Sequence, residues 1–306
     1  MHILKDSIQT NFLQNNDVII DIETTGVSRN SSNVIVVGLL FPDSVEDNFL
    51  QYAVSDVGEE KDLLEIINEL LKAKNIISFN GEVFDLPFLK SRMNSYGITP
   101  FIEKSQFDIY RYIVSNKHFL NLENFSLQSV EKFYGIERYE NFELENDIRF
   151  YSDLLNDEII SSIMLHNKND VLNTEKILNI YHDTEDIKSF YVKLNSEKIR
   201  VKIDRIMMDK DFLNIYLISD KIFDYRFENS DYYMGIEKGK IQIRMRILQG
   251  YIDKNKIGVV HHQKIKPYIK NPCEILENML LIYTDEIYNL SGIKMLIDRL
   301  FRLFIK

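Results

Sequence analysis

Residues 17–26, DVIIDIETTG, place two acidic side chains in a stretch that is otherwise typical of a buried strand. The β-branched run Asp17–Ile22 predicts the strand, and the Thr-Thr-Gly sequence after it predicts a loop. Asp21 and Glu23 are two positions apart, so both side chains lie on the same face of a strand. Two carboxylates buried together repel each other unless a cation lies between them. Because Mg²⁺ and Mn²⁺ prefer oxygen ligands, this stretch predicts a divalent metal site.

The first half of the chain alternates strand and helix patterns around this stretch. Short apolar and β-branched runs predict further strands at Asn33–Phe41, Asn48–Val54, Asn75–Phe79 and Gln106–Ile109. Apolar residues at helical spacing predict helices at Glu59–Lys74, at Phe84–Tyr96 and over most of Ser126–Tyr181, with Ser126 as a cap. Three strands in a meander followed by strand–helix alternation predict an α/β fold with a mixed sheet flanked by helices.

The second half has a different pattern, and the polar stretch His182–Lys188 is interpreted as the boundary between two domains, 1–183 and 184–306. Polar and apolar residues alternate strictly in Lys198–Ile206 and Lys238–Leu248, which predicts half-buried antiparallel strands. We therefore expect the second domain to be smaller and β-rich. Helices are predicted to end the chain, at Cys273–Tyr288 and Ile293–Ile305.

The composition excludes several classes of protein. The chain has 306 residues, enough for about two domains, and its 45% hydrophobic content excludes a disordered chain. A single cysteine excludes a disulfide framework and any multi-cysteine zinc or iron–sulfur site. The longest clean apolar run, Val34–Phe41, is too short to cross a bilayer, and the opening MHILKDSIQTNF has no apolar signal core. We therefore expect a soluble, cytoplasmic protein with no membrane partner.

The net charge of −10 is divided unevenly along the chain. Residues 1–183 carry 15 Lys and Arg against 30 Asp and Glu, whereas residues 184–306 carry 22 against 17. The predicted strands of the second domain have a basic polar face, formed by Lys198, Arg200, Lys202, Lys240, Arg244 and Arg246. This row could neutralise the phosphates of a nucleic acid, or it could be the solvated face of an ordinary sheet.

Two further motifs contain acidic residues suited to catalysis. Asp85 in SFNGEVFDLPFL (78–89) follows a predicted strand and begins a helix, a position at which α/β proteins commonly bind ligands. Asp170 in HNKND (166–170) lies one helical turn after His166, so the two side chains share a face. A metal-binding carboxylate beside an imidazole can activate a water molecule, and two metal ions can bind the attacking and leaving oxygens of a phosphodiester.

In this order, DIETTG, FNGEVFDLPFL and HNKND resemble the three exonuclease motifs of the DEDD (DnaQ-like) 3′–5′ exonucleases, which have a ribonuclease H-like fold. The second motif is similar to that of the proofreading domain of family B DNA polymerases. The first half as a whole is similar to stand-alone bacterial predicted exonucleases. The resemblance covers residues 15–181. It implies a ribonuclease H-like fold with a mixed sheet, and an enzyme that removes nucleotides from the 3′ end of DNA or RNA.

The resemblance also implies roles for individual residues. Two Mg²⁺ or Mn²⁺ ions would be held by Asp21, Glu23, Asp85 and Asp170. The terminal nucleotide would be bound by Thr24, Thr25, Asn80 and Phe84. His166 would act on the attacking water. In the family, a tyrosine occupies this spacing before the last aspartate, or a histidine lies one residue farther away; here a histidine occupies the tyrosine spacing.

Two other functions remain open at this stage. The same two-metal centre would serve a structure-specific endonuclease, because an open groove allows internal cleavage. The altered position of the histidine is also compatible with a catalytically silent nucleic-acid-binding module. Contacts with the 2′-hydroxyl distinguish RNA from DNA, and the sequence does not reveal them.

Overall fold

The computed structural model describes residues 1–138, 157–194, 197–254, 256–264 and 266–305. Contacts between residues divide the chain into two compact units. The first unit consists of Met1–Ser115 and Leu122–Ile180, and the second of Asn116–Asn121 and Tyr181–Lys306. Each unit has a hydrophobic core of its own.

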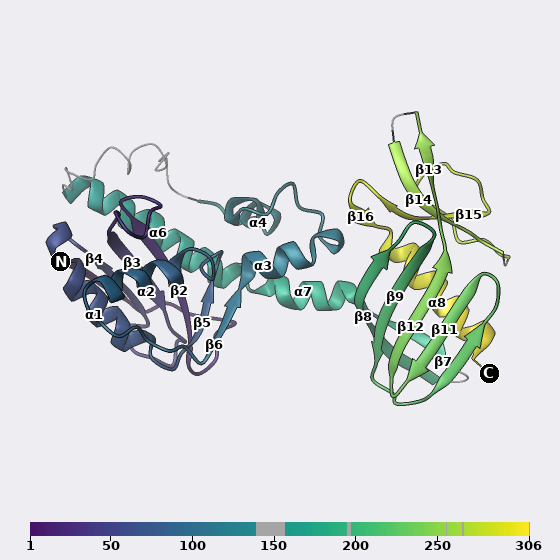
Figure 1. Cartoon of the computed structure of the whole chain (residues 1–306), viewed down its shortest axis with the longest axis horizontal. Coiled ribbons are helices and arrows are strands. Elements are labelled where there is room, and N and C mark those ends of the chain that lie inside the picture. Colours follow the sequence, from purple (N-terminus) through teal and green to yellow (C-terminus); the bar gives the residue numbers. More distant parts are fainter. Residues whose placement is uncertain (139–156, 195–196, 255, 265, 306) are drawn as a thin grey trace. The chain divides into compact units, whose positions relative to one another are not determined.

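The described part of the first unit is built on a six-stranded sheet with the order β1-β4-β3-β2-β5-β6 (Figure 1). Strand β2 is antiparallel to β3 and parallel to β5, which is parallel to β6, so the sheet is mixed, as the sequence predicts. Strand β1, which the sequence pattern does not predict, pairs with β4. The strands are β1 (His2–Asp6), β2 (Asp17–Thr24), β3 (Val34–Leu40), β4 (Phe49–Ala53), β5 (Asn75–Ser78) and β6 (Ser105–Asp108).

Every residue of β3 is buried, because helices pack on this sheet. Helix α6 packs on β2, β3 and β4, and α1 packs on β3 and α2. Ser126 caps α4 as predicted, and residues 139–156 of the predicted helical stretch lie outside the described residues. No helix of the described chain is long and apolar enough to cross a bilayer. The helices are α1 (Glu60–Leu71), α2 (Asp85–Ser95), α3 (Ile109–Ser115), α4 (Leu127–Phe133), α6 (Asp157–Ile177) and α7 (Asn179–Lys188), with 3₁₀ turns at Val57–Glu59 and Lys117–Phe119.

A buried ion pair attaches α2 to the rest of the first unit. Glu60 on α1 is fully buried, and its two carboxylate oxygens accept hydrogen bonds of 2.9 and 2.6 Å from Arg92 on α2. The same carboxylate accepts from the Val34 N–H of β3 and from the Tyr96 hydroxyl. Removing one partner of a buried pair would leave an uncompensated charge, so this cluster holds α2, and with it Asp85, against the sheet.

The second unit contains two antiparallel sheets and helix α8 (Leu290–Phe304). One face of the larger sheet is apolar and packs against α8. The core between them includes Ile215 and Ile243 of the sheet and Leu296 and Ile297 of α8. The larger sheet has the order β10-β11-β12-β9-β8-β7 and the smaller β13-β14-β15-β16. The strands are β7 (Ser189–Leu194), β8 (Glu197–Met208), β9 (Phe212–Ser219), β10 (Tyr225–Glu228), β11 (Tyr232–Glu237), β12 (Lys240–Arg246), β13 (Leu248–Asp253), β14 (Lys256–His262), β15 (Met279–Thr284) and β16 (Ile287–Tyr288).

The predicted helix at Cys273–Tyr288 is wrong. Residues Met279–Thr284 form strand β15, which pairs with β14 on one side and β16 on the other. A short run of consecutive apolar residues fits a buried strand as well as a helix, and pairing with β14 decides between them. Asp285 and Glu286 have positive φ values of 49° and 62° and form the turn into β16. The chain therefore ends in one described helix, α8, rather than two.

The polar stretch His182–Lys188, interpreted from the sequence as the domain boundary, lies within helix α7. The start of one predicted strand differs from the structure. Strand β12 begins at Lys240 rather than Lys238, because Lys238 and Gly239 have φ values of 50° and 79° and form the turn after β11. The predicted strand Lys198–Ile206 lies within β8.

Candidate active site

Strand β2 carries Asp21 and Glu23 at the centre of the first sheet. Both side chains are half-buried and alternate with the buried residues Ile20 and Ile22, so they share a face as predicted. Strand β2 pairs with β5 as far as Ile19, whereas it pairs with β3 as far as Thr24. The acidic end of β2 therefore extends beyond its parallel neighbour, at the carboxyl ends of the parallel strands, where α/β proteins bind ligands.

Asp21 is held by a polar row that the sequence motifs do not reveal. Gly38 on β3 lies opposite Asp21, and Gln51 on β4 lies opposite Gly38. Asn167 on α6 donates to the Asp21 carbonyl oxygen at 3.0 Å and to Asp21 Oδ2 at 2.7 Å, and its own Oδ1 accepts from Gln51 Nε2 at 2.7 Å. A Cβ at Gly38 would lie 2.3 Å from Asn167 Oδ1. The missing side chain thus allows Asn167 to reach Asp21.

Asp85 lies at the start of α2 and is buried. Its Oδ1 accepts a hydrogen bond of 3.0 Å from the Ile22 N–H, which joins the α2 terminus to β2 between the two acids. Asp108, at the end of β6, accepts from the backbone N–H groups of Asn80 and Glu82 at 3.0 Å each. Asp108 therefore fixes the loop that leads to Asp85.

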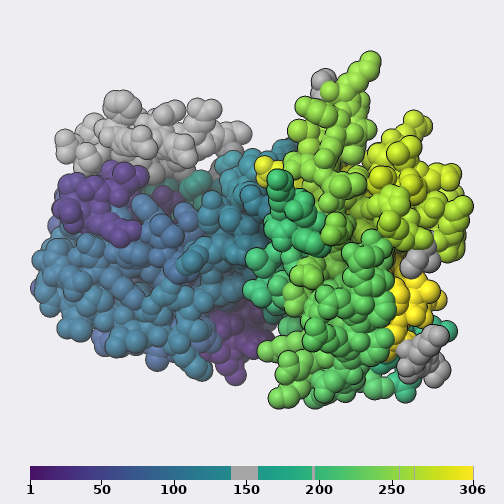
Figure 2. Space-filling model, turned by 45° about the vertical axis from the view of Figure 1, so that its right-hand side comes forward, coloured from purple at the N-terminus to yellow at the C-terminus, as the bar shows by residue number. Residues whose placement is uncertain are grey.

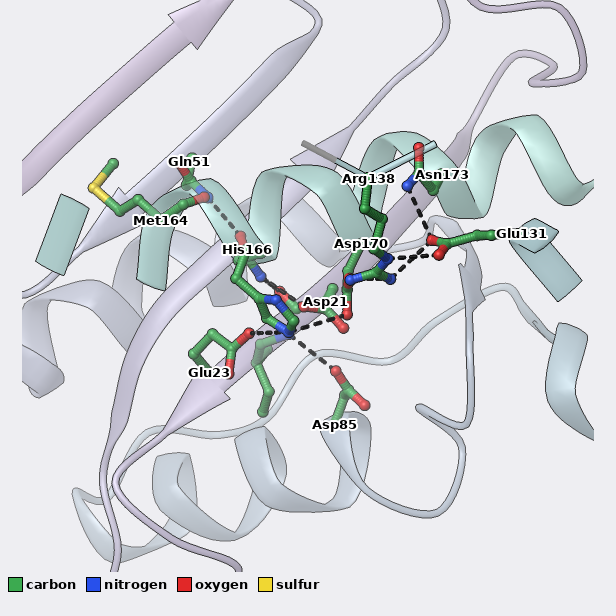
Figure 3. Close-up of polar contacts among 12 residues, drawn as sticks. Asp21, Glu23, Gln51, Asp85, Glu131, Arg138, Met164, His166, Asp170 and Asn173 are labelled. Carbon is green, nitrogen blue, oxygen red and sulfur yellow. Dashed lines mark hydrogen bonds and ion pairs between the residues drawn. The ribbon is translucent and has the colours of Figure 1, made fainter. Parts of the chain in front are cut away.

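Helix α6 brings His166 and Asp170 to the acids of β2 (Figure 3). His166 Nε2 lies 3.7 Å from Asp170 Oδ2 and 3.9 Å from Glu23 Oε1. The structure thus brings together Glu23, His166 and Asp170, although Glu23 is far from the other two in the sequence. All three side chains are 15–23% exposed, so the cluster is reached from the surface.

Arg138 and Glu131 extend this cluster, and neither follows from the sequence motifs. Arg138 Nη2 lies 2.7 Å from Asp170 Oδ1, and the guanidinium donates to both oxygens of Glu131, at 2.5 and 2.8 Å. Glu131 is buried and also accepts from Asn173 Nδ2 at 2.9 Å. Figure 3 shows this chain of contacts from Asn173 through Glu131 and Arg138 to Asp170. It leaves Asp170 with an arginine counter-charge on one oxygen.

The carboxylates raise one another's pKa values. Burial raises the pKa of Asp21 well above its usual range, and the negative charges of Asp170, Asp85 and Glu23 raise it further, against the Asn167 hydrogen bond. Burial likewise raises the pKa of Asp170, whereas the interactions with His166 and with the Arg138 guanidinium oppose the rise. The site therefore concentrates more negative charge than its own cations offset.

Burial also raises the pKa of Asp85, to about 7. The backbone N–H groups of Ile22 and of Asp85 itself oppose this rise, and the charges of Asp108 and Asp170 add to it.

The carboxylates of Asp21, Glu23, Asp85 and Asp170 fit a divalent cation by their chemistry, because Mg²⁺ and Mn²⁺ prefer oxygen ligands. A cation would also relieve the repulsion among these carboxylates. Among the residues that the structure describes, no group of three or more His, Cys, Asp or Glu side chains is arranged so that it could hold a metal ion. In this arrangement Arg138 supplies a positive charge at Asp170.

The residues expected at the substrate end are in part engaged by the protein itself. Thr24 Oγ1 donates to the Gly26 carbonyl at 2.8 Å, and Thr25 Oγ1 accepts from the Asn33 N–H at 2.9 Å. Both hydroxyls therefore shape the loop after β2. Asn80 is exposed with a positive φ of 66°, and the Phe84 ring packs 5.5 Å from that of Phe88.

The six predicted basic residues lie on β8 and β12 of the second unit. Lys202 and Lys240 lie on either side of Ile218 on the intervening strand β9. Lys202 forms an ion pair of 2.7 Å with Glu185, and Arg200 lies 3.8 Å from Asp186, both on α7. Acidic residues of α7 thus offset part of this row. The remaining members are Lys198, Arg244 and Arg246.

A mixed sheet with acidic side chains on its central strand and an acidic helix packed over it defines the ribonuclease H-like class of folds. The chain belongs to the RNase H superfamily, whose family model matches residues 18–182. Proteins of this superfamily typically hydrolyse phosphodiester bonds. No curated protein matches the chain.

Two solved structures are among those similar to the chain. The family B DNA polymerase from the archaeon Pyrobaculum calidifontis is 10% identical, with a TM-score of 0.44 over 65% of this chain and 33% of the polymerase. The chain thus spans about one third of that polymerase. NrnC from Brucella melitensis with bound Mg²⁺ is 16% identical, with a TM-score of 0.39 over 56% of this chain and 75% of NrnC.

The contact between Asn167 and Gly38 predicts the effect of a single methyl group. We expect Gly38→Ala to lower the free energy of unfolding by about 1–3 kcal/mol, because the methyl group overlaps Asn167 Oδ1 and Val171 Cγ2. Urea denaturation measures this change. Gly250→Ala is the matched control, because a Cβ at Gly250 meets no atom within 4 Å. Equal stability of the two variants would contradict this account of the α6 contact.

The raised pKa of Asp85 predicts how stability depends on pH. In the unfolded chain this carboxyl ionises near its ordinary value of 3.8, whereas the folded protein keeps the proton up to about pH 7. Stability of the metal-free protein should therefore fall as the pH rises from about 4 to 7. Thermal unfolding in EDTA at pH 5 and pH 8 measures the fall.

Asp85→Asn should reduce this fall, because the amide oxygen still accepts from Ile22 but carries no charge. Asp62→Asn, at an exposed position on α1, should show the same fall in stability between pH 5 and pH 8 as the unmodified protein. Mg²⁺ or Mn²⁺ should raise the melting temperature at pH 8 more than at pH 5. A fall of the same size in Asp85→Asn would show that other groups cause it.

Proposed function

We propose that this chain is a metal-dependent 3′–5′ exonuclease of the DEDD (DnaQ-like) type, which hydrolyses phosphodiester bonds of DNA or RNA from a single-stranded or 3′ end. The observation that carries the proposal is the meeting of Glu23 on β2 with His166 and Asp170 on α6, beside Asp21 and Asp85. These residues come from three separate motifs, and their carboxylates repel one another. A nuclease that binds divalent cations needs such a set of acids.

In this proposal Asp21, Glu23, Asp85 and Asp170 hold two Mg²⁺ or Mn²⁺ ions. When bound, the ions supply Lewis-acid chemistry that stabilises charge on the phosphodiester oxygens. Asn167 keeps the Asp21 carboxylate in place through its 2.7 Å hydrogen bond. Ile22 does the same for Asp85 through its backbone N–H.

His166 receives the proton of the attacking water at Nε2, the atom that lies nearest Glu23 and Asp170. The imidazolium that results lies 3.7 Å from Asp170 Oδ2 and 3.9 Å from Glu23 Oε1. Arg138, held by Glu131, offsets the charge of Asp170. The terminal nucleotide is positioned by Thr24 at the end of β2, by Thr25 and Asn80 in loops, and by Phe84 at the start of α2.

The test uses 5′-labelled single-stranded DNA, single-stranded RNA and duplexes with 3′ overhangs, each with Mg²⁺, Mn²⁺ or EDTA. We expect a ladder that shortens by single nucleotides from the 3′ end, with no cleavage in EDTA or by Asp21→Asn. The exposed Asp62→Asn should cleave like the unmodified protein. Internal fragments would instead identify an endonuclease. Binding without cleavage in every metal would identify a catalytically silent module.

His166 can be tested separately because it occupies the spacing at which the resembled family has tyrosine. We expect His166→Phe to slow cleavage by about 10²–10⁴-fold, the usual contribution of a general base. His166→Tyr should recover part of this loss, because its hydroxyl can orient the water. The pH dependence of the rate should also change in both variants. Full activity of His166→Phe would exclude His166 from proton transfer.

A further inference from the structure

The second unit presents a sheet face that lies opposite its apolar core. On β9, Leu213, Ile215 and Leu217 are buried in the core, so the alternate residues Phe212, Asn214 and Tyr216 lie on the other face. Strand β12 alternates in the same way, with Ile241, Ile243 and Met245 in the core and Gln242, Arg244 and Arg246 on the other face. In Figure 2 the strands of this sheet, in green, form much of the visible surface of the second unit.

Strand register aligns the polar face into a row across five strands. Tyr216 lies opposite Gln242 on β12 and opposite Arg205 on β8. Gln242 in turn lies opposite Gly235 on β11, which lies opposite Arg226 on β10. A β-bulge between Ile203 and Arg205 produces the alignment of Arg205 with Tyr216.

Each aromatic ring of this face has an arginine guanidinium beside it. The Arg205 guanidinium lies 4.2 Å from the centre of the Tyr216 ring. Arg244 and Arg246 lie 5.2 and 5.6 Å from the Phe212 ring. These are cation–π distances. The Tyr233 ring has two such partners, Arg226 at 5.8 Å and Arg244 at 5.6 Å. We call Arg205, Phe212, Tyr216, Arg226, Tyr233, Arg244 and Arg246 the arginine–aromatic face.

A hollow of about 810 Å³ lies on this face. Its lining includes Arg205, Tyr216, Arg226, Tyr233 and Gly235. A Cβ at Gly235 would lie 2.4 Å from the Tyr233 hydroxyl, so the glycine makes room for the ring. The hollow therefore has aromatic and guanidinium planes along its walls.

The charges of the hollow select among possible ligands. Its lining also contains Asp204, Asp224 and Glu237, which oppose Arg205, Arg226 and Lys240. Glu228 lies 3.6 Å from both Arg226 and Arg244. A ligand that used phosphate contacts alone would gain little here, whereas a ligand with flat rings would stack on the aromatic and guanidinium planes. The uneven charge of the chain, 22 Lys and Arg against 17 Asp and Glu in residues 184–306, still favours an anion.

We propose that the arginine–aromatic face binds single-stranded nucleic acid, with bases stacked on Phe212, Tyr216 and Tyr233 and phosphates near Arg244 and Arg246. A duplex would not fit this chemistry, because its bases already stack on one another. The site lies in the second unit, outside the residues of the RNase H superfamily match, and binding there does not require hydrolysis. Binding at this face can therefore be tested separately from the proposed exonuclease activity.

The experiment measures fluorescence anisotropy of labelled oligo(dT) and oligo(U) with the full-length protein in EDTA, which prevents metal-dependent cleavage. We expect Tyr216→Ala and Phe212→Ala each to weaken binding about 10-fold, within the usual contribution of one stacked base. Tyr216→Phe keeps the ring and should bind within about twofold of the unmodified protein. A labelled duplex should bind more weakly than either single strand.

Tyr251→Ala is the matched control, since Tyr251 is 76% exposed on β13 of the other sheet. It should leave the affinity unchanged. Circular dichroism and thermal unfolding verify that each variant is folded. Unchanged affinity in a folded Phe212→Ala, Tyr216→Ala double variant would overturn the proposal, as would absence of single-strand binding or equal binding of duplex. Asp21→Asn should retain this binding even where cleavage is lost, which separates the two proposals.

Discussion

The hydrogen bonds from Asn167 to Asp21 depend on a glycine, Gly38 of β3, whose missing side chain leaves room for Asn167. Gly38 lies opposite Asp21, and any Cβ there would overlap Asn167. Because α6 carries Asn167 beside His166 and also carries Asp170, its close approach to β3 sets the position of all three residues relative to β2. One glycine in a strand of otherwise larger residues thus allows α6 to bring His166 and Asp170 to the acids of β2.

The second constraint is the repulsion among these acids. Burial and neighbouring negative charges raise the pKa values of Asp21, Asp85 and Asp170. The protein offsets the repulsion with Arg138 at Asp170 and with amide and backbone donors at Asp21 and Asp85. Such an arrangement costs stability in the absence of a cation, which is a reason to regard it as functional rather than structural.

In the second unit, strands and a helix separate an apolar core from a polar sheet face. Its larger sheet buries one face against α8 and leaves the other polar, so strict alternation along β9 and β12 separates core from surface. Acids on α7 engage Arg200 and Lys202 of β8, whereas Arg244 and Arg246 of β12 lie beside an aromatic ring. The basic row predicted from the sequence is therefore divided between two environments.

The sequence by itself determined the features that depend on local periodicity: Asp21 and Glu23 share a face because strands have period two, and His166 and Asp170 share a face because they are one helical turn apart. Tertiary structure decided the rest. The apolar run Met279–Thr284 is compatible with either a helix or a strand, and only pairing with β14 makes it a strand. Arg138, Glu131 and Asn173 meet through contacts between separate segments, and Arg205 reaches Tyr216 through a bulge. Such contacts depend on distances in space, which sequence spacing does not specify.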